Sequence, residues 1–188
     1  MVTATDKLIN VENYAMDEIW QKFIVPGTKD TYTHEELFAT AVPVITIFEG
    51  VPVDKAFAYL SDIQTLSDWT ISLRELQPFR GDIYVAREDA SPTGKVYIRV
   101  LANEQAHTIE WQCNHSDPDD LWMVYKCMVV DANQVLGRPG SAFIWVVFVH
   151  EKVQEDPALA AGYKMMYTAH SIEAGNLKKV LESRFAGR

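Results

Sequence analysis

A series of short β-like segments that ends in one long helix is the feature that most restricts how this chain can fold. Turn-forming sequences separate the segments: RGD, ASPTG, NEQ, HSDPDD and GRPGS. Gly, Pro, Asn and Asp in such positions favour hairpins and tight loops. We therefore predict strands at 71–78, 82–88, 94–102, 107–114, 120–131 and 141–152. Strands joined this closely pair antiparallel, as a meander.

The C-terminal segment predicts the long helix. Asp156 is a suitable N-cap and Pro157 suits the first helical position. The helix ends near Phe185, before Gly187, which gives a length of about 45 Å at about 1.5 Å per residue. The elements expected before the meander are a strand and two short helices, at 42–50, 52–62 and 63–69.

His170 lies at the centre of the apolar stripe of the long helix. At about 100° per residue, six apolar side chains fall within about 40° of it; they are Leu159, Tyr163, Met166, Ala174, Leu177 and Leu181. Such a stripe must face the sheet. A histidine there is either a hydrogen-bonded core residue or a partner for a ligand in a cavity, and the sequence leaves both open. Methionine and tyrosine suit a cavity wall, because one adapts its shape and the other has a polar tip.

Alternation predicts which strand residues face this helix. Lys126 points to solvent, so its neighbours on both sides point inward. The inward residues are Ile109, Trp111, Cys113 and His115 on one strand, and Met123, Tyr125, Cys127 and Val129 on the next. Residues 142–149 are apolar on both faces and need cover on both sides. We favour the N-terminal extension as that cover, and a second subunit in a homodimer is the alternative.

Charge and length exclude several classes of protein. The net charge of −9 disfavours nucleic-acid binding and adhesion to an anionic membrane. No apolar run is long enough to span a bilayer, and the N-terminus has no signal-peptide pattern. Cys113 and Cys127 lie in apolar strands, which predicts buried thiols in a reducing compartment. We expect a cytoplasmic protein.

Metal and nucleotide motifs are missing from the sequence. Cys113 and His115 share a strand face, with Cys127 on the neighbouring strand, but their spacing matches no zinc pattern. No glycine-rich phosphate loop, dinucleotide fingerprint or G-x-S-x-G elbow is present. We predict no metal site and no cofactor.

The segment VITIFEGVPVDKAFAYLSDIQTLSDW resembles the opening of the START-related superfamily called SRPBCC. That superfamily includes polyketide cyclase/dehydratases, the birch-pollen-allergen family, abscisic-acid receptors and lipid-transfer START domains. The shared pattern is a strand, a Pro-containing turn, a helix with paired apolar residues (Ala56 and Phe57), an aspartate (Asp62) and a closing tryptophan (Trp69). The resemblance covers about 42–185, so we divide the chain into an N-terminal helical extension, 1–41, and a helix-grip domain, 42–188.

The resemblance implies an α+β helix-grip fold, in which a seven-stranded antiparallel sheet wraps round the C-terminal helix. Between them it implies a largely apolar pocket for a lipid, a polyketide or another aromatic molecule. The ligand-binding candidates are Trp69, Arg99, Trp111, Met123, Trp145, Met166, Ala174 and Leu177. The catalytic candidates are His170 as base, with Tyr125 or Tyr163 as hydrogen-bond donor to an enolate oxygen.

Three functions remain open at this point. The first is binding of a small hydrophobic ligand with acid–base cyclisation or dehydration, in which positioning supplies much of the rate. The second is a carrier or sensor that binds the same kind of ligand without converting it. The third is a protein-interaction module like the chaperone-activator branch of the superfamily, which would need a large exposed apolar patch.

Overall fold

The computed structural model describes residues 44–88, 91, 93–148 and 157–186, with side chains on the last helix described from Ala169 onward. Contacts divide the chain into residues 1–41 and 42–188, and the description concerns the second unit. The N-terminal helical extension expected at 1–41 lies outside the described residues, as does the end of the strand expected at 141–152. No helix in the described part is long and apolar enough to cross a membrane.

Seven strands and a few helices make up this unit. In chain order the elements are β1 (Val44–Glu49), α3 (Val53–Ser61), the 3-10 helix η4 (Ile63–Thr65), α4 (Leu66–Trp69), β2 (Leu73–Arg80), β3 (Ile83–Glu88), β4 (Lys95–Asn103), β5 (Thr108–Asn114), β6 (Met123–Asp131), α5 (Ala132–Leu136), β7 (Gly140–Phe148) and α7 (Pro157–Phe185). The predicted strands and the long helix are all present.

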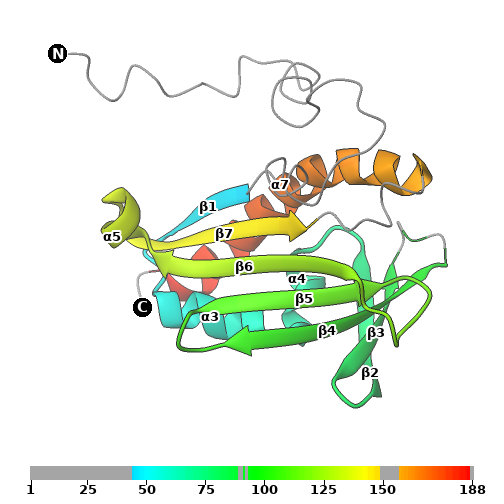
Figure 1. The fold of residues 1–188 in the computed structure, drawn as a ribbon. Coiled ribbons are helices and arrows are strands. Elements are labelled where there is room, and N and C mark those ends of the chain that lie inside the picture. The colour runs from blue at the N-terminus through cyan, green and yellow to red at the C-terminus, as the bar shows by residue number, and fades with distance from the viewer. Residues whose placement is uncertain (1–43, 89–90, 92, 149–156, 187–188) are drawn as a thin grey trace. The chain divides into compact units, whose positions relative to one another are not determined.

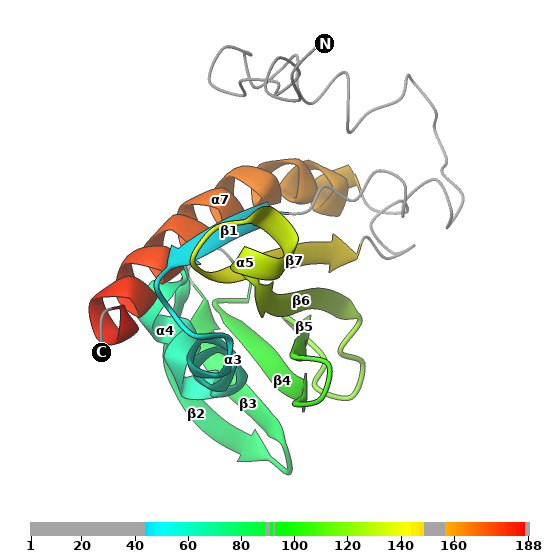
Figure 2. The ribbon, with the colours of Figure 1, turned by 90° about the vertical axis from the view of Figure 1, so that its left-hand side faces the viewer.

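The strands form one antiparallel sheet in the order β1-β7-β6-β5-β4-β3-β2. The first strand of the sheet therefore pairs with the last one. The short helices α3 and α4 and the long helix α7 lie on the same side of the sheet, with α7 running beside β1 (Figures 1 and 2). This is the expected α+β helix-grip architecture.

The inner face of the sheet follows the predicted alternation. On β5 and β6 the inward side chains are buried, with Ile109, Trp111 and Cys127 at most 3% exposed. Lys126 points the other way and lies 3.2 Å from the Glu110 carboxylate of the neighbouring strand. Apolar residues thus lie on one face of these strands, and the core lies between that face and the helices.

One edge of the sheet is bonded to α7. Lys178 Nζ donates to the Ile47 carbonyl over 2.6 Å, and the Glu49 N–H donates to Glu182 Oε1 over 2.7 Å. The two α7 side chains are themselves an ion pair four residues apart, with 2.5 Å between Nζ and Oε1. Main-chain groups of β1 that face no strand thus find partners on the helix.

The opposite flank of α7 is bonded to the segment that follows α4. Glu173 Oε1 accepts from the Ile71 N–H over 3.0 Å, and Asn176 Nδ2 donates to the Trp69 carbonyl over 3.2 Å. Near the end of the helix, Arg184 forms an ion pair of 2.9 Å with Asp68. The helix is therefore attached on both sides of its apolar stripe.

The other edge strand, β2, is irregular. Its register with β3 shifts between Arg74 and Gln77 and again between Pro78 and Arg80. Glu75 lies in the left-handed region with φ of 57°. These irregularities interrupt the regular row of N–H and C=O groups along that edge.

The sequence does not predict α5, which connects β6 to β7. Its N-terminus is capped by Asp131, whose carboxylate accepts from the Asn133 N–H over 2.8 Å. Gly137, which follows the last helical residue and caps it, adopts φ of 66°, the left-handed conformation that ends many helices. Both capping signals are in the sequence, but the helix is too short for periodicity to reveal it.

Removing the link between α7 and β1 should destabilise the fold. We expect Glu182→Ala to lower the free energy of unfolding by about 1–3 kcal/mol, because it leaves the part-buried Glu49 N–H without its acceptor and removes the carboxylate that pairs with Lys178. Urea titration monitored by circular dichroism measures the change. Lys179→Ala, at an exposed position of the same helix, is the matched control, and an equal loss in both variants would contradict the assignment.

Candidate functional site

His170 is the polar ring buried between α7 and the sheet. It is 6% exposed. Its ring stacks on Trp145 of β7, with 4.0 Å between centroids and 29° between planes. Tyr125 of β6 meets it edge-on at 5.6 Å. The stripe of the long helix therefore places this imidazole against aromatic rings of two strands.

Three tryptophans form a triangle beside this histidine. Trp69 closes α4, Trp111 lies on β5 and Trp145 lies on β7; each is at most 4% exposed. Their ring centroids are 6.1 Å (69 to 111), 5.7 Å (69 to 145) and 6.0 Å (111 to 145) apart. All three indole N–H groups are buried without a hydrogen-bond partner. We call these residues the tryptophan triangle.

Burial makes His170 a neutral imidazole. Loss of hydration lowers its pKa to about 4, and no neighbouring charge contributes to the shift. Among the described side chains, none forms a hydrogen bond with the ring. At neutral pH one ring nitrogen is therefore a hydrogen-bond donor and the other an acceptor.

Glu173 lies one helical turn further along α7 and is also buried, at 7% exposure. Burial raises its pKa to about 7; the Ile71 N–H opposes this shift, and the charge of Glu88 adds to it. A carboxyl group with such a pKa can donate or accept a proton near neutral pH. Sequence reasoning missed Glu173, although three residues after His170 is a position on the same helix face.

Glu88 on β3 is a second, partly buried carboxylate of the region. Ser72 Oγ donates to its Oε1 over 2.5 Å, and His115 Nε2 lies 3.3 Å from its Oε2. Burial raises the pKa of Glu88, but the hydrogen bonds from His115 and Ser72 and the charge on His115 outweigh it and leave the pKa below its ordinary value. Glu88 is thus the ionised partner of the more easily protonated Glu173.

The structure brings several of the predicted site residues together. Around His170 it places Tyr125 and the tryptophan triangle; Met123, Ala174 and Leu177 are buried in the same core. The side chains of Tyr163 and Met166 lie outside the described residues. Their proposed roles stay predictions.

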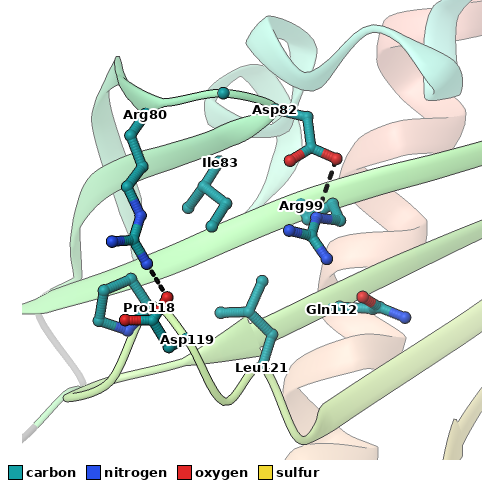
Figure 3. Close-up of a pocket in the computed structure, with 9 residues that line it drawn as sticks. Arg80, Asp82, Ile83, Arg99, Gln112, Pro118, Asp119 and Leu121 are labelled. Carbon is teal, nitrogen blue, oxygen red and sulfur yellow. Dashed lines mark hydrogen bonds and ion pairs between the residues drawn. The ribbon is translucent and has the colours of Figure 1, made fainter.

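Arg99 is on the other side of the sheet. It lines an outer pocket of about 470 Å3 between the β2–β3 turn and the β5–β6 loop, together with Ile83 and Gln112 (Figure 3). There Arg99 Nε lies 2.9 Å from Asp82 Oδ2. The two groups form an ion pair but not a hydrogen bond. The sequence did not decide the facing of this strand, and the structure separates Arg99 from the His170 region.

The two cysteines are free and buried. Burial raises the pKa of both Cys113 and Cys127, so both are protonated thiols with little nucleophilic character. Across the described side chains, no three His, Cys, Asp or Glu residues gather in a way that could hold a metal ion. The functional groups described on the inner face are therefore acid–base side chains and aromatic rings.

Comparison with protein families gives one match over this unit. Residues 42–188 match the family described as "Domain of unknown function (DUF8713)". A search of curated proteins found no match.

Solved structures with the same fold are distant in sequence. The di-domain ARO/CYC BexL of the BE-7585A biosynthetic pathway is 15% identical with a TM-score of 0.56, over 74% of this chain and 45% of that one. Protein NE0264 from Nitrosomonas europaea is 11% identical with a TM-score of 0.55, over 77% and 95%. Protein MLL2253 from Mesorhizobium loti is 20% identical with a TM-score of 0.51, over 76% and 97%. At these identities the likeness concerns the fold.

The two shifted groups of α7 should affect the pH dependence of stability in opposite directions. The pKa of His170 falls from 6.5 to about 4, so the unfolded chain binds the extra proton between these values and stability is lost as pH falls through this range. The pKa of Glu173 rises from 4.5 to about 7, so the folded chain retains the proton and stability is lost as pH rises through that range. Each effect amounts to about 3 kcal/mol at about 1.36 kcal/mol per pKa unit.

Urea unfolding between pH 4 and pH 8 tests both signs. Relative to the wild type, His170→Phe should remove the loss at acid pH, and Glu173→Gln should remove the loss toward neutral pH while retaining an acceptor for Ile71. Ser171→Ala, at an exposed position between them, is the control. Variant curves parallel to the wild-type curve would show that these groups are not shifted as described.

Proposed function

The chain belongs to the DUF8713 family, and we propose that it binds a small, ring-bearing hydrophobic molecule between α7 and the inner face of the sheet. The observation that supports this most is the state of His170. It is buried, stacked on Trp145, and has no hydrogen-bond partner among the described side chains. Buried polar groups need hydrogen bonds, and a ligand bound beside Trp145 would supply one to this imidazole.

Aromatic side chains around His170 support a ring-bearing ligand. Trp145, Tyr125 and Trp111 come from neighbouring strands and present faces and edges that stack on planar molecules. Few polar groups in an aromatic setting are typical of small-molecule sites. The solved structure named as an ARO/CYC has the same fold, which is consistent with such a ligand.

We propose further that the site catalyses acid–base cyclisation or dehydration of its ligand. In this scheme Glu173 exchanges a proton with the ligand, since its pKa of about 7 lets both forms exist at neutral pH. His170 stays neutral and positions a carbonyl oxygen through one ring nitrogen. Tyr125 remains the candidate donor to an enolate oxygen. The aromatic side chains around His170 hold a flexible ligand in one conformation, and this positioning supplies the rest of the rate enhancement.

Extraction and turnover separate an enzyme from a carrier. Protein purified from its native host should release a bound aromatic or polyketone compound into organic solvent, detectable by mass spectrometry. Incubation of that compound with fresh protein should yield a cyclised or dehydrated product, and Glu173→Gln should slow this about 10²-fold or more while it keeps the affinity. Return of the compound unchanged would identify a carrier and remove the catalytic part of the proposal.

A fluorescent probe tests the location of the site. N-phenyl-1-naphthylamine should bind with increased, blue-shifted emission, because the site is aromatic and shielded from water. Ala174→Phe should weaken binding about tenfold or more, since Ala174 is 1% exposed and a larger side chain there occupies the inner face. Ile172→Phe adds the same group at an exposed position of α7 and should leave binding unchanged. Equal behaviour of the two variants would place the probe elsewhere.

A further inference from the structure

The inner face has unused hydrogen-bonding capacity of one kind. In the described core, the buried side-chain atoms without partners are the three indole N–H groups of the tryptophan triangle and the hydroxyl of Ser141. An indole nitrogen can only donate a hydrogen bond. The unmet need that all four groups share is therefore for an acceptor, since the hydroxyl can also donate.

The three donors belong to rings that pack together and are not scattered through the core. The indoles of Trp69, Trp111 and Trp145 are in mutual contact, although they come from α4, β5 and β7. Buried N–H groups usually find a partner, and each one that does not costs folding free energy. Phenylalanine would fill a core of this kind without that cost. Three unpaired donors on one cluster of rings therefore point to acceptor atoms that arrive with a ligand.

Charge around the triangle disfavours an anionic ligand. The buried polar and charged residues among those described are Thr70, Asn114, Ser141, His170 and Glu173, and they include no lysine or arginine. His170 is neutral, and Glu88 contributes a negative charge to the region. Among the described buried residues, an anion would find no cation to pair with, which is strongly unfavourable. The acceptors must then belong to a neutral molecule.

We propose that the tryptophan triangle selects neutral aromatic molecules that bear carbonyl oxygens, through indole N–H donation to those oxygens. This inference rests on the proposed binding function and adds the ligand's chemical class to it. Molecules of the same shape without an oxygen acceptor bind more weakly, because the donors stay unpaired. Molecules of the same shape with a carboxylate also bind more weakly, because the charge is buried unpaired.

Three commercial probes of nearly the same shape test the selection. They are 9-fluorenone, which has one carbonyl oxygen, fluorene, which has none, and 9-fluorenone-4-carboxylate, which is an anion. Dissociation constants come from quenching of tryptophan fluorescence and from isothermal titration calorimetry of the full chain. We expect 9-fluorenone to bind about tenfold more tightly than fluorene, the effect of one buried hydrogen bond, and more tightly than the carboxylate.

Replacement of single donors locates the contact. Trp69→Phe, Trp111→Phe and Trp145→Phe each keep an aromatic ring and remove one N–H. At least one of them should bring the affinity ratio of 9-fluorenone to fluorene close to one. Trp122→Phe, outside the triangle, is the control and should leave the ratio unchanged. Because each variant is compared on two probes, a general loss of packing lowers both affinities and does not imitate the result.

The outcomes distinguish this inference from the proposed function. Equal affinity for 9-fluorenone and fluorene, or a preference that survives all three replacements, overturns the donor inference and leaves ligand binding in place. Tighter binding of the carboxylate overturns the preference for neutral ligands. Should the folded wild-type protein bind none of the three probes, the proposed binding function itself would be contradicted. In the wild type, slowed solvent exchange of the assigned indole protons with 9-fluorenone and not with fluorene gives an independent check.

Discussion

The fixed position of α7 is the constraint on which the inner face depends. Lys178 and Glu182 attach one flank of the helix to the main chain of β1, and Glu173 and Asn176 attach the other flank to the segment after α4. A helix held on both sides cannot roll, so the stripe between these attachments keeps its direction. Because His170 lies in that stripe, its contact with Trp145 is set by polar bonds several residues away as well as by packing.

Burial acts on the two titratable groups of this helix in opposite ways. It favours the uncharged form of each, which lowers the pKa of His170 to about 4 and raises that of Glu173 to about 7. The interior therefore contains an imidazole that is neutral at neutral pH and a carboxyl group that is close to half protonated there. Such a carboxyl group can donate or accept a proton near neutral pH, while the imidazole adds no charge to the core.

Much of the fold could be predicted from local patterns, since alternation in β5 and β6 gives the buried face and the period of α7 gives its stripe. The residues of the candidate site were harder to predict. Glu173 was missed because its burial depends on a bond to the main chain of Ile71, about a hundred residues away in sequence. The sequence does not tell which face of the sheet Arg99 lies on, because its strand has apolar residues on both faces. The sequence also gives no sign of unpaired indole donors, because the positions of the tryptophans in the chain are the same whether or not their nitrogen atoms find partners.

The treatment of the two sheet edges also limits how copies of this protein can associate. On β1 the Ile47 carbonyl and the Glu49 N–H are bonded to α7, and β2 is interrupted by register shifts and by Pro78. Neither border therefore offers an uninterrupted template on which a strand from another molecule could be added. Fibril-like growth by β-augmentation is disfavoured at both of these edges.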